Sequence, residues 1–220
     1  MEKKAILIIV IAIVITMAGC ASLEKVGTQS QDSFFGSNLI KNGNAEEGPT
    51  VLFDEIEERQ TPHYWNDVEG EVCISEYGKG AGGELAEAEI RGAGENYFWG
   101  GKVSYSEIEQ IADVSEGSEW IDKGVVTFEL SGFLGGYRRQ NDRAVLLAEF
   151  LDKNGVVLAS VQIGPVTNAD RNNATTMVFR ETTGNVPEGT QSIRFQLNAI
   201  REEGTANDGY ADDLSMVLRK

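Results

Sequence analysis

Apolar and polar side chains alternate along several stretches between residue 125 and the end of the chain. Val126, Phe128 and Leu130 alternate with Thr127, Glu129 and Ser131. The stretches 143–151, 156–163, 176–180, 192–201 and 209–218 have the alternation or the apolar composition of strands. Turn sequences such as 152–155 and 186–190 separate them. Many short strands with turns between them are typical of a β-sandwich or a β-barrel.

The part of the chain before residue 125 shows the same tendency less clearly. Residues 71–74 and 106–114 resemble strands, and 96–101 resembles the end of one. Only Leu85–Ile90 has enough helical periodicity for one turn. We therefore predict an all-β fold of two antiparallel sheets. Its interior should contain Phe128, Leu130, Phe195, Leu197, Leu214 and Met216.

The last strand contains an acidic residue in an unexpected position. Leu214, Met216 and Leu218 alternate with Ser215 and Val217. Asp212 has the same parity as the apolar set, so the pattern predicts that its carboxylate points inward. A buried carboxylate is costly unless it is paired or binds a metal. We expect another part of the chain to meet Asp212.

The first residues carry a targeting signal. Lys3 and Lys4 precede the apolar run Ala5–Ile15, and Met17-Ala18-Gly19-Cys20 places small residues before a cysteine. This arrangement resembles the signal peptide and lipobox of bacterial-type lipoproteins. The resemblance implies a signal peptide over 1–19 and lipid on Cys20. Because Ala21 is not an aspartate, the resemblance also implies the outer membrane as the location in a Gram-negative host. A plain transmembrane anchor is the alternative, but the run is shorter than the roughly 20 residues that a span needs.

Composition and charge indicate the domain organisation and exclude some kinds of binding site. Residues 20–37 are rich in Ser, Gln and Gly and predict a tether, and 38–220 has the length of one all-β domain. The formal charge of −16 argues against nucleic acid, whose binding needs basic residues. If Cys20 carries lipid, Cys73 has no partner and is predicted to be a buried free cysteine. The glycine-rich stretch 78–83 lacks the strand and helix of a phosphate-binding loop.

The two ends of the predicted domain suggest a family. The start, Asn38-Leu39-Ile40-Lys41-Asn42-Gly43-Asn44-Ala45-Glu46-Glu47-Gly48, and the end, Tyr210-Ala211-Asp212-Asp213-Leu214, resemble those of galactose-binding-like jelly rolls. The middle, from Gly132 to Ala144, is similar to domains of secreted bacterial proteins in that superfamily. The resemblance spans about residues 38 to 218 and implies a two-sheet jelly roll. Several families of carbohydrate-binding modules share this fold.

The resemblance also supplies a partner for Asp212. In many such modules the first and last strands lie close together and a structural calcium joins them. By motif position the ligands here are Glu46 and Asp212. Calcium takes six to eight oxygens, so carbonyls and further acids must contribute. The alternative is that Asp212 accepts protein hydrogen bonds and Glu46 is solvated.

The same resemblance implies glycan as the ligand, which needs exposed aromatic rings and polar groups. Ala45 departs from the pattern, because an aromatic residue is common there. The best candidates for sugar contact are Tyr97, Trp99, Tyr137, Arg138, Arg139, Asn141 and Asp142. Aromatic side chains serve equally well as core, and the polar loop 135–142 could simply be solvated.

Catalysis has little support in the sequence. His63 is the only histidine, and no nucleophile-elbow pattern is present. Paired carboxylates at the separation of a glycosidase cannot be recognised from sequence. We therefore predict a membrane-tethered, extracytoplasmic module that binds glycan and is not an enzyme. A structural or protein-interaction lipoprotein without a sugar site is the main alternative, and a hydrolase is the weaker one.

Overall fold

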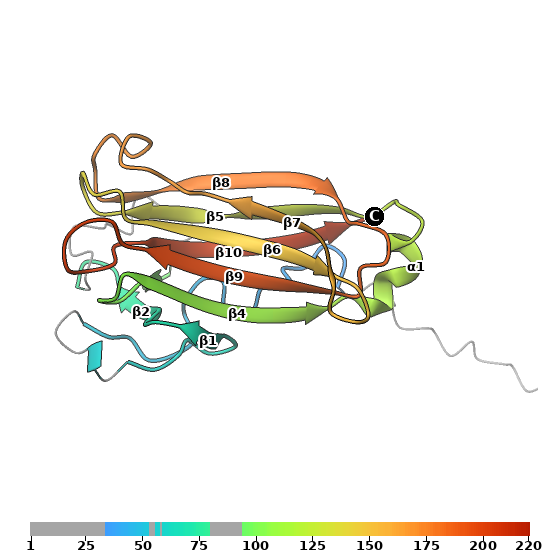
Figure 1. Ribbon diagram of the computed structural model, residues 1–220, viewed down its shortest axis with the longest axis horizontal. Coiled ribbons are helices and arrows are strands. Elements are labelled where there is room, and N and C mark those ends of the chain that lie inside the picture. The colour runs from blue at the N-terminus through green and yellow to red at the C-terminus, as the bar shows by residue number, and fades with distance from the viewer. Residues whose placement is uncertain (1–33, 53–55, 58, 80–93) are drawn as a thin grey trace, which may run out of the picture.

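The computed structural model describes residues 34–52, 56–57, 59–79 and 94–220 (Figure 1). The predicted signal peptide, Cys20, most of the tether and the helical turn at 85–90 lie outside the described residues. Within them, the predicted all-β sandwich is confirmed. Two antiparallel five-stranded sheets face each other.

Each sheet draws its strands from across the chain. Sheet 1 has the order β1 (Asn66–Glu69), β4 (Tyr105–Asp113), β9 (Ser192–Ile200), β6 (Arg143–Leu151), β7 (Val157–Ile163). Sheet 2 has the order β2 (Cys73–Glu76), β3 (Asn96–Trp99), β10 (Tyr210–Arg219), β5 (Thr127–Gly136), β8 (Thr176–Asn185). A 3-10 turn (Ser115–Gly117) and the one-turn helix α1 (Ser118–Ile121) connect β4 to β5. Neighbours such as β10 and β5 are distant in sequence, as in a jelly roll.

The core between the sheets follows the alternation in the sequence. All six residues predicted to be inside are at most 7 % exposed. They come from β5, β9 and β10, so both sheets contribute to one apolar layer. Burial of each such side chain stabilises the fold by roughly 1.5–3 kcal/mol. β8 is longer than its predicted stretch, 176–180, because its polar second half still pairs with β5 as far as Asn185.

A β-bulge in β10 corrects one prediction. Asp212 pairs with Phe133 and Ser215 pairs with Ser131, so both Asp213 and Leu214 lie opposite Gly132. Asp213 has the left-handed φ of 48° that the extra residue of a bulge can adopt. The prediction that Asp212 points inward with Leu214 was wrong, because the bulge reverses the parity. Asp212 is fully buried, but on the outer face of sheet 2 beside Tyr77.

The first described residues lie along the last strand. Gly36 and Leu39 donate backbone hydrogen bonds to Leu218 and Met216, and Leu214 donates one to Gly43. The Asn38 side chain adds bonds to the backbone of Leu214 and Met216. Phe34 and Phe35, which the sequence places in the tether, pack against the core. The expectation that the two ends of the domain are neighbours is therefore confirmed.

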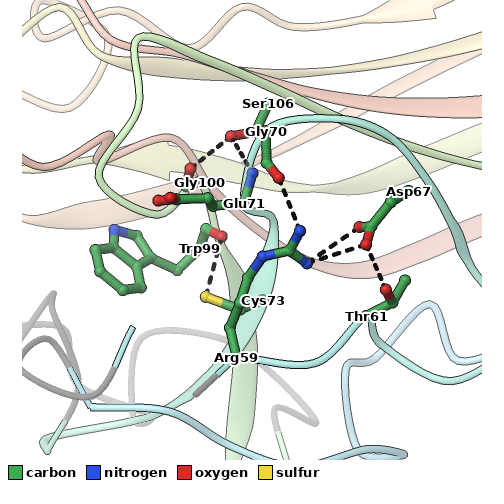
Figure 2. A network of polar contacts seen from close by, with 9 residues as sticks. All are labelled: Arg59, Thr61, Asp67, Gly70, Glu71, Cys73, Trp99, Gly100 and Ser106. Carbon is green, nitrogen blue, oxygen red and sulfur yellow. Dashed lines mark hydrogen bonds and ion pairs between the residues drawn. The ribbon is translucent and has the colours of Figure 1, made fainter. Parts of the chain in front are cut away.

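A polar network fastens the connection before β2 to the rest of the domain. Figure 2 shows the Arg59 guanidinium between the Asp67 carboxylate, at 3.2 Å, and the Gly70 carbonyl, at 2.8 Å. The Ser106 hydroxyl accepts a bond from Glu71 N and donates one to Gly100 O. These bonds tie residues 59–71 to the start of β4.

The second cysteine of the chain lies beside this network. Cys73 is a buried free cysteine, as predicted, and its sulfur lies 3.7 Å from the Trp99 carbonyl (Figure 2). Burial raises the pKa of the Cys73 thiol, so the thiol stays protonated. We therefore treat Cys73 as part of the packed interior.

Candidate functional site

Two loops at one end of the sandwich form a shallow pocket. The β5–β6 loop contributes Tyr137 to Gln140, and the β7–β8 loop contributes Asn173 to Thr175. The pocket has a volume of about 690 Å³. We call it the loop pocket. Three of the seven residues predicted to bind ligand line it: Tyr137, Arg138 and Arg139.

The polar side chains of the loop pocket surround one partly buried aromatic ring. The Arg138 guanidinium lies 4.9 Å from the centroid of the Tyr137 ring. Arg138 N donates to Thr175 Oγ1 at 3.3 Å, which joins the two loops. Arg138 and Arg139 are both exposed, whereas Tyr137 is half-buried. The arrangement offers an aromatic surface beside several hydrogen-bond donors, which suits a polar ligand with one apolar face.

A buried arginine holds the two loops together. Arg171 is 2 % exposed, and its guanidinium donates to the carbonyls of Gly136 at 2.7 Å, Arg138 at 3.1 Å and Gln140 at 2.8 Å. It also donates to the carbonyl of Ala174. One side chain therefore fixes backbone on both sides of the pocket. Sequence reasoning missed Arg171, because a single arginine in a polar loop gives no periodic signal.

Two buried acids, Asp142 and Asp208, lie near Arg171. Burial raises the pKa of Asp208 to about 6; the Tyr210 hydroxyl, which donates to it at 2.8 Å, and the Arg171 charge act the other way. The neighbouring Asp142 adds to the upward shift. Burial likewise lowers the pKa of Arg171, while nearby acidic groups raise it. Arg171, Asp142 and Asp208 thus form a buried cluster of charged groups next to the loop pocket.

Two of the predicted ligand-binding residues are not brought into the pocket. Asp142 is fully buried, and its carboxylate accepts backbone N–H bonds from Glu202, Glu203 and Asp208. It therefore fixes the 202–208 loop. Asn141 is half-buried, and its carbonyl accepts a bond from Arg143. The sequence predicted ligand contact for Asn141 and Asp142 only because the whole loop is polar.

Tyr97 and Trp99 are also buried and lie outside the loop pocket. Both have no exposed surface. They belong to a buried, largely aromatic cluster on the outer face of sheet 2 that also contains Val51 and Ile56. The Tyr97 ring centroid lies 4.9 Å from that of Tyr77 and 5.3 Å from that of Tyr210, the separations of packed aromatic pairs. In this conformation neither residue presents a face to a ligand, so the alternative of core packing fits them.

The two predicted calcium ligands each have protein partners. Asp212 accepts hydrogen bonds from the Tyr77 hydroxyl at 2.6 Å and from Asp213 N at 2.7 Å. Glu46 accepts two bonds of 2.9 Å from the backbone and the side chain of Asn96. Burial raises the pKa of Asp212 to about 8, and the charges of Asp213 and Glu46 push it the same way. The carboxylates are therefore close enough to repel each other.

This donor set fits calcium in its chemistry. The carboxylates of Glu46 and Asp212 are hard oxygen ligands, and a divalent cation would relieve their repulsion. Among the described residues, no group of three or more His, Cys, Asp or Glu side chains is placed to hold a metal. Backbone carbonyls and water would therefore have to complete the coordination. The metal remains a prediction.

The outer face of sheet 1 carries a second polar surface that sequence reasoning missed. The Tyr105 hydroxyl lies 2.6 Å from both Glu107 Oε2 and Asn198 Oδ1, and Gln196 donates to Glu107 Oε1 at 2.6 Å. These residues are only partly buried. The polar half of the alternation along 192–201 was the available signal. We call this surface the polar ladder; its groups are already bonded to one another.

Comparisons with known proteins agree with the fold. A structure described as "Family 16 Carbohydrate Binding Module-2" is 18% identical, covers 82% of this chain and 99% of its own, and has a TM-score of 0.50. The CBM22-1 xylan-binding domain from Paenibacillus barcinonensis Xyn10C is 14% identical, with coverages of 84% and 97% and a TM-score of 0.42. The predicted jelly roll of the carbohydrate-binding-module type is thereby confirmed as a fold.

A larger protein contains a similar region. The enzymatically active domain of Bacteriophage CBA120 tailspike protein 4 is 16% identical, with a TM-score of 0.46 over 83% of this chain. The chain spans only about a fifth of the tailspike chain, 21%. No protein-family model matches the sequence, and no curated protein matches it. Of the described residues, none form a helix long and apolar enough to cross a membrane.

Proposed function

We propose that this protein is a glycan-binding module of the bacterial cell envelope and that it binds without catalysing a reaction. The observation that carries the proposal is the loop pocket, where Tyr137 lies beside the exposed Arg138 and Arg139. A sugar ring has an apolar face of C–H groups and a rim of hydroxyls. The Tyr137 ring matches the first and the guanidinium groups match the second.

The loop pocket is also suited to binding because it is preformed. Arg171 fixes the carbonyls of both loops, so little chain ordering is needed when a ligand enters. The similarity to a carbohydrate-binding module supports the proposal through the fold. The two exposed arginines lie in a chain of net charge −16, so the pocket is a local exception to the acidic surface. A glycan with hydroxyls or a carboxylate at this position would gain charge-assisted hydrogen bonds.

The proposal includes a membrane anchor and a structural calcium. Lipid on Cys20 would hold the domain outside the cytoplasm, on the outer membrane if the host is Gram-negative. Residues 20–33 would then span the distance from the lipid to the domain. Calcium between Glu46 and Asp212 would stabilise the contact between the first and last strands and would take no part in sugar contact.

A glycan array followed by calorimetry tests the function. The purified chain is screened against an array, and the best oligosaccharide is then titrated. We expect Tyr137→Ala to weaken binding at least tenfold, because the ring supplies the apolar contact. Phe179→Ala is the matched control, since Phe179 is 45% exposed on β8 outside the loop pocket.

A further variant separates the two exposed polar surfaces. Gln196→Ala removes one member of the polar ladder and leaves the loop pocket intact. Binding lost in Gln196→Ala but kept in Tyr137→Ala would move the site to sheet 1. Absence of binding to every glycan on the array would contradict the proposal.

A further inference from the structure

A cleft of about 440 Å³ runs along the edge of sheet 1, away from the loop pocket. β4 continues to Asp113, whereas β1 pairs with it only as far as Glu109, opposite Asn66. The end of β4 is therefore uncovered by β1. The N-terminal segment at residues 38–41 forms the other wall. We call this feature the edge cleft.

An exposed aromatic residue and an exposed aliphatic residue meet in the edge cleft. Tyr64 is 54% exposed and Ile111 is 59% exposed, and both line it. Large apolar side chains this exposed are ordinary when they are isolated, but here two share one concavity. The ammonium of Lys41 lies 5.8 Å from the centroid of the Tyr64 ring. The Tyr64 ring thus lies beside the Lys41 ammonium and is still exposed to solvent.

The backbone of Tyr64 has an unfavourable conformation. Its φ is 68°, in the left-handed region that costs a non-glycine residue roughly 1–2 kcal/mol. The turn in which Trp65 N donates to Pro62 O buries the Trp65 side chain in the core and leaves Tyr64 on the surface. The fold therefore keeps an aromatic ring outward at a position where glycine would be less strained.

Two hydrogen bonds join the walls of the edge cleft. Lys41 N donates to Gln110 Oε1 at 2.9 Å, and Gln110 Nε2 donates to Lys41 O at 3.0 Å. The backbone N–H and carbonyl of Lys41 are therefore already paired with the side chain of Gln110. Among the described residues, the Lys41 ammonium makes no ion pair with a carboxylate, and the exposed Asn66 amide makes no side-chain hydrogen bond.

We propose that the edge cleft is a second saccharide-binding site. The apolar face of a sugar would rest on Tyr64 and Ile111, and its hydroxyls would bond to Lys41 and Asn66. The proposal rests on the proposed function and adds a second subsite for the same class of ligand. With both sites, the domain would bind a polysaccharide at two points.

The positions of the two sites suit a long polymer. The edge cleft lies where β4 meets the start of β9, because Ile111 pairs with Arg194. The loop pocket lies beyond the other end of β9, because Arg143, just after the β5–β6 loop, pairs with Ile200. The nine residues of β9 span about 30 Å at roughly 3.3 Å per residue. A chain that reaches both sites would bind more tightly than a short one, by on the order of 100-fold or more.

Two-dimensional NMR of the isotope-labelled chain tests the two sites separately. The probes are the hexasaccharides of the cello, xylo, manno and laminari series. We expect one probe to shift the amide signals of Lys41, Tyr64 and Asn66 as well as those of residues 138–140. Tyr64→Gly should abolish the first set and leave the second unchanged. This variant keeps the fold, because glycine relieves the strained φ.

The outcomes distinguish the two claims. Shifts confined to residues 138–140, or cleft shifts that persist in Tyr64→Gly, would overturn the second site and leave the proposed function standing. Tyr137→Ala should show the reciprocal pattern, with cleft shifts kept and loop-pocket shifts lost. Phe179→Ala should change neither set. No shift with any of the four series would contradict both proposals.

Discussion

The Tyr77 hydroxyl donates a 2.6 Å hydrogen bond to the carboxylate of Asp212, which lies 135 residues further along the chain. The bond exists because the bulge at Asp213 turns Asp212 away from the apolar core and toward the outer face of sheet 2. A buried carboxylate bonded to a neutral phenol keeps most of its desolvation cost. The bond therefore fixes the direction in which the Asp212 side chain points. A cation beside Asp212 would reduce the remaining desolvation cost.

Calcium should raise the stability of the folded chain. If the ion binds between Glu46 and Asp212 and hardly binds the unfolded chain, a hundredfold excess over Kd adds about 2.7 kcal/mol to the free energy of unfolding. At roughly 2–4 °C per kcal/mol, the melting midpoint should rise by roughly 5–10 °C. Thermal unfolding in chelator and in millimolar calcium measures this. Magnesium should substitute poorly, since it demands octahedral geometry.

Charge-removing variants show whether the ion acts through these two residues. Asp212→Asn and Glu46→Gln should each lose the calcium response, and the double variant should lose little more. In chelator above about pH 8, where Asp212 is charged, Asp212→Asn should melt no lower than the wild type, because the buried position then holds a neutral group. Identical wild-type midpoints in chelator and in calcium would eliminate the metal.

Asp208 should make stability depend on pH. Its pKa is about 6 in the folded protein and roughly 3.9 in an unfolded chain, so between these values the folded state binds more protons. The contribution of Asp208 to the free energy of unfolding is therefore greatest below about pH 4. It falls as the pH rises to about 6, by on the order of 2–3 kcal/mol. The groups facing Asp208 are Asp142, Arg171 and Tyr210.

The comparison with one variant isolates this contribution from that of other acids. Asp208→Asn keeps an acceptor for the Tyr210 hydroxyl and removes the titration. Denaturant unfolding of both proteins from pH 4 to pH 7 gives the difference. A difference that does not change across this range would show that Asp208 titrates normally.

Replacement of Arg171 should loosen the loop pocket. Arg171→Met leaves the carbonyls of Gly136, Arg138 and Gln140 without their donor. The free energy of unfolding should fall by about 2–4 kcal/mol, as for a lost buried network. Hydrogen exchange should speed up in the two loops, at residues 138–140 and 172–175, before it speeds up in the strands of sheet 2. Uniform acceleration across both sheets would indicate a global effect instead.

The strands and the core follow from the sequence because they depend on local periodicity. β5 and β9 alternate cleanly, and their inward residues are the ones predicted. The bulge was not foreseeable, since a single residue with positive φ at Asp213 changes the parity of the strand start without changing the pattern. Similarity at both ends of the domain indicated correctly that they meet.

The candidate site was predictable only in part. Tyr137, Arg138 and Arg139 are recognisable as an aromatic and basic loop, whereas their partners at 173–175 come from a loop more than thirty residues later. Tyr97 and Trp99 have the composition of a sugar platform, but both are buried in one cluster with Val51 and Ile56. Membership of this cluster depends on long-range packing, which has no signature in the sequence around Tyr97 and Trp99.

The lipid anchor can be tested in cells. Labelled palmitate should enter the wild-type protein, because Cys20 follows Met17-Ala18-Gly19. Cys20→Ser should abolish the label, while Cys73→Ser is the matched control because Cys73 is buried in the domain. Label that persists in Cys20→Ser would argue against the lipoprotein assignment.

Titration calorimetry of the best array glycan against the wild-type chain, Tyr137→Ala and Phe179→Ala tests directly whether the loop pocket binds glycan. We expect saturable binding by the wild type, binding at least tenfold weaker for Tyr137→Ala, and unchanged binding for Phe179→Ala. Equal binding by all three proteins would place the glycan outside the loop pocket. No heat of binding with any of them would contradict the proposal that this jelly roll is a glycan-binding module.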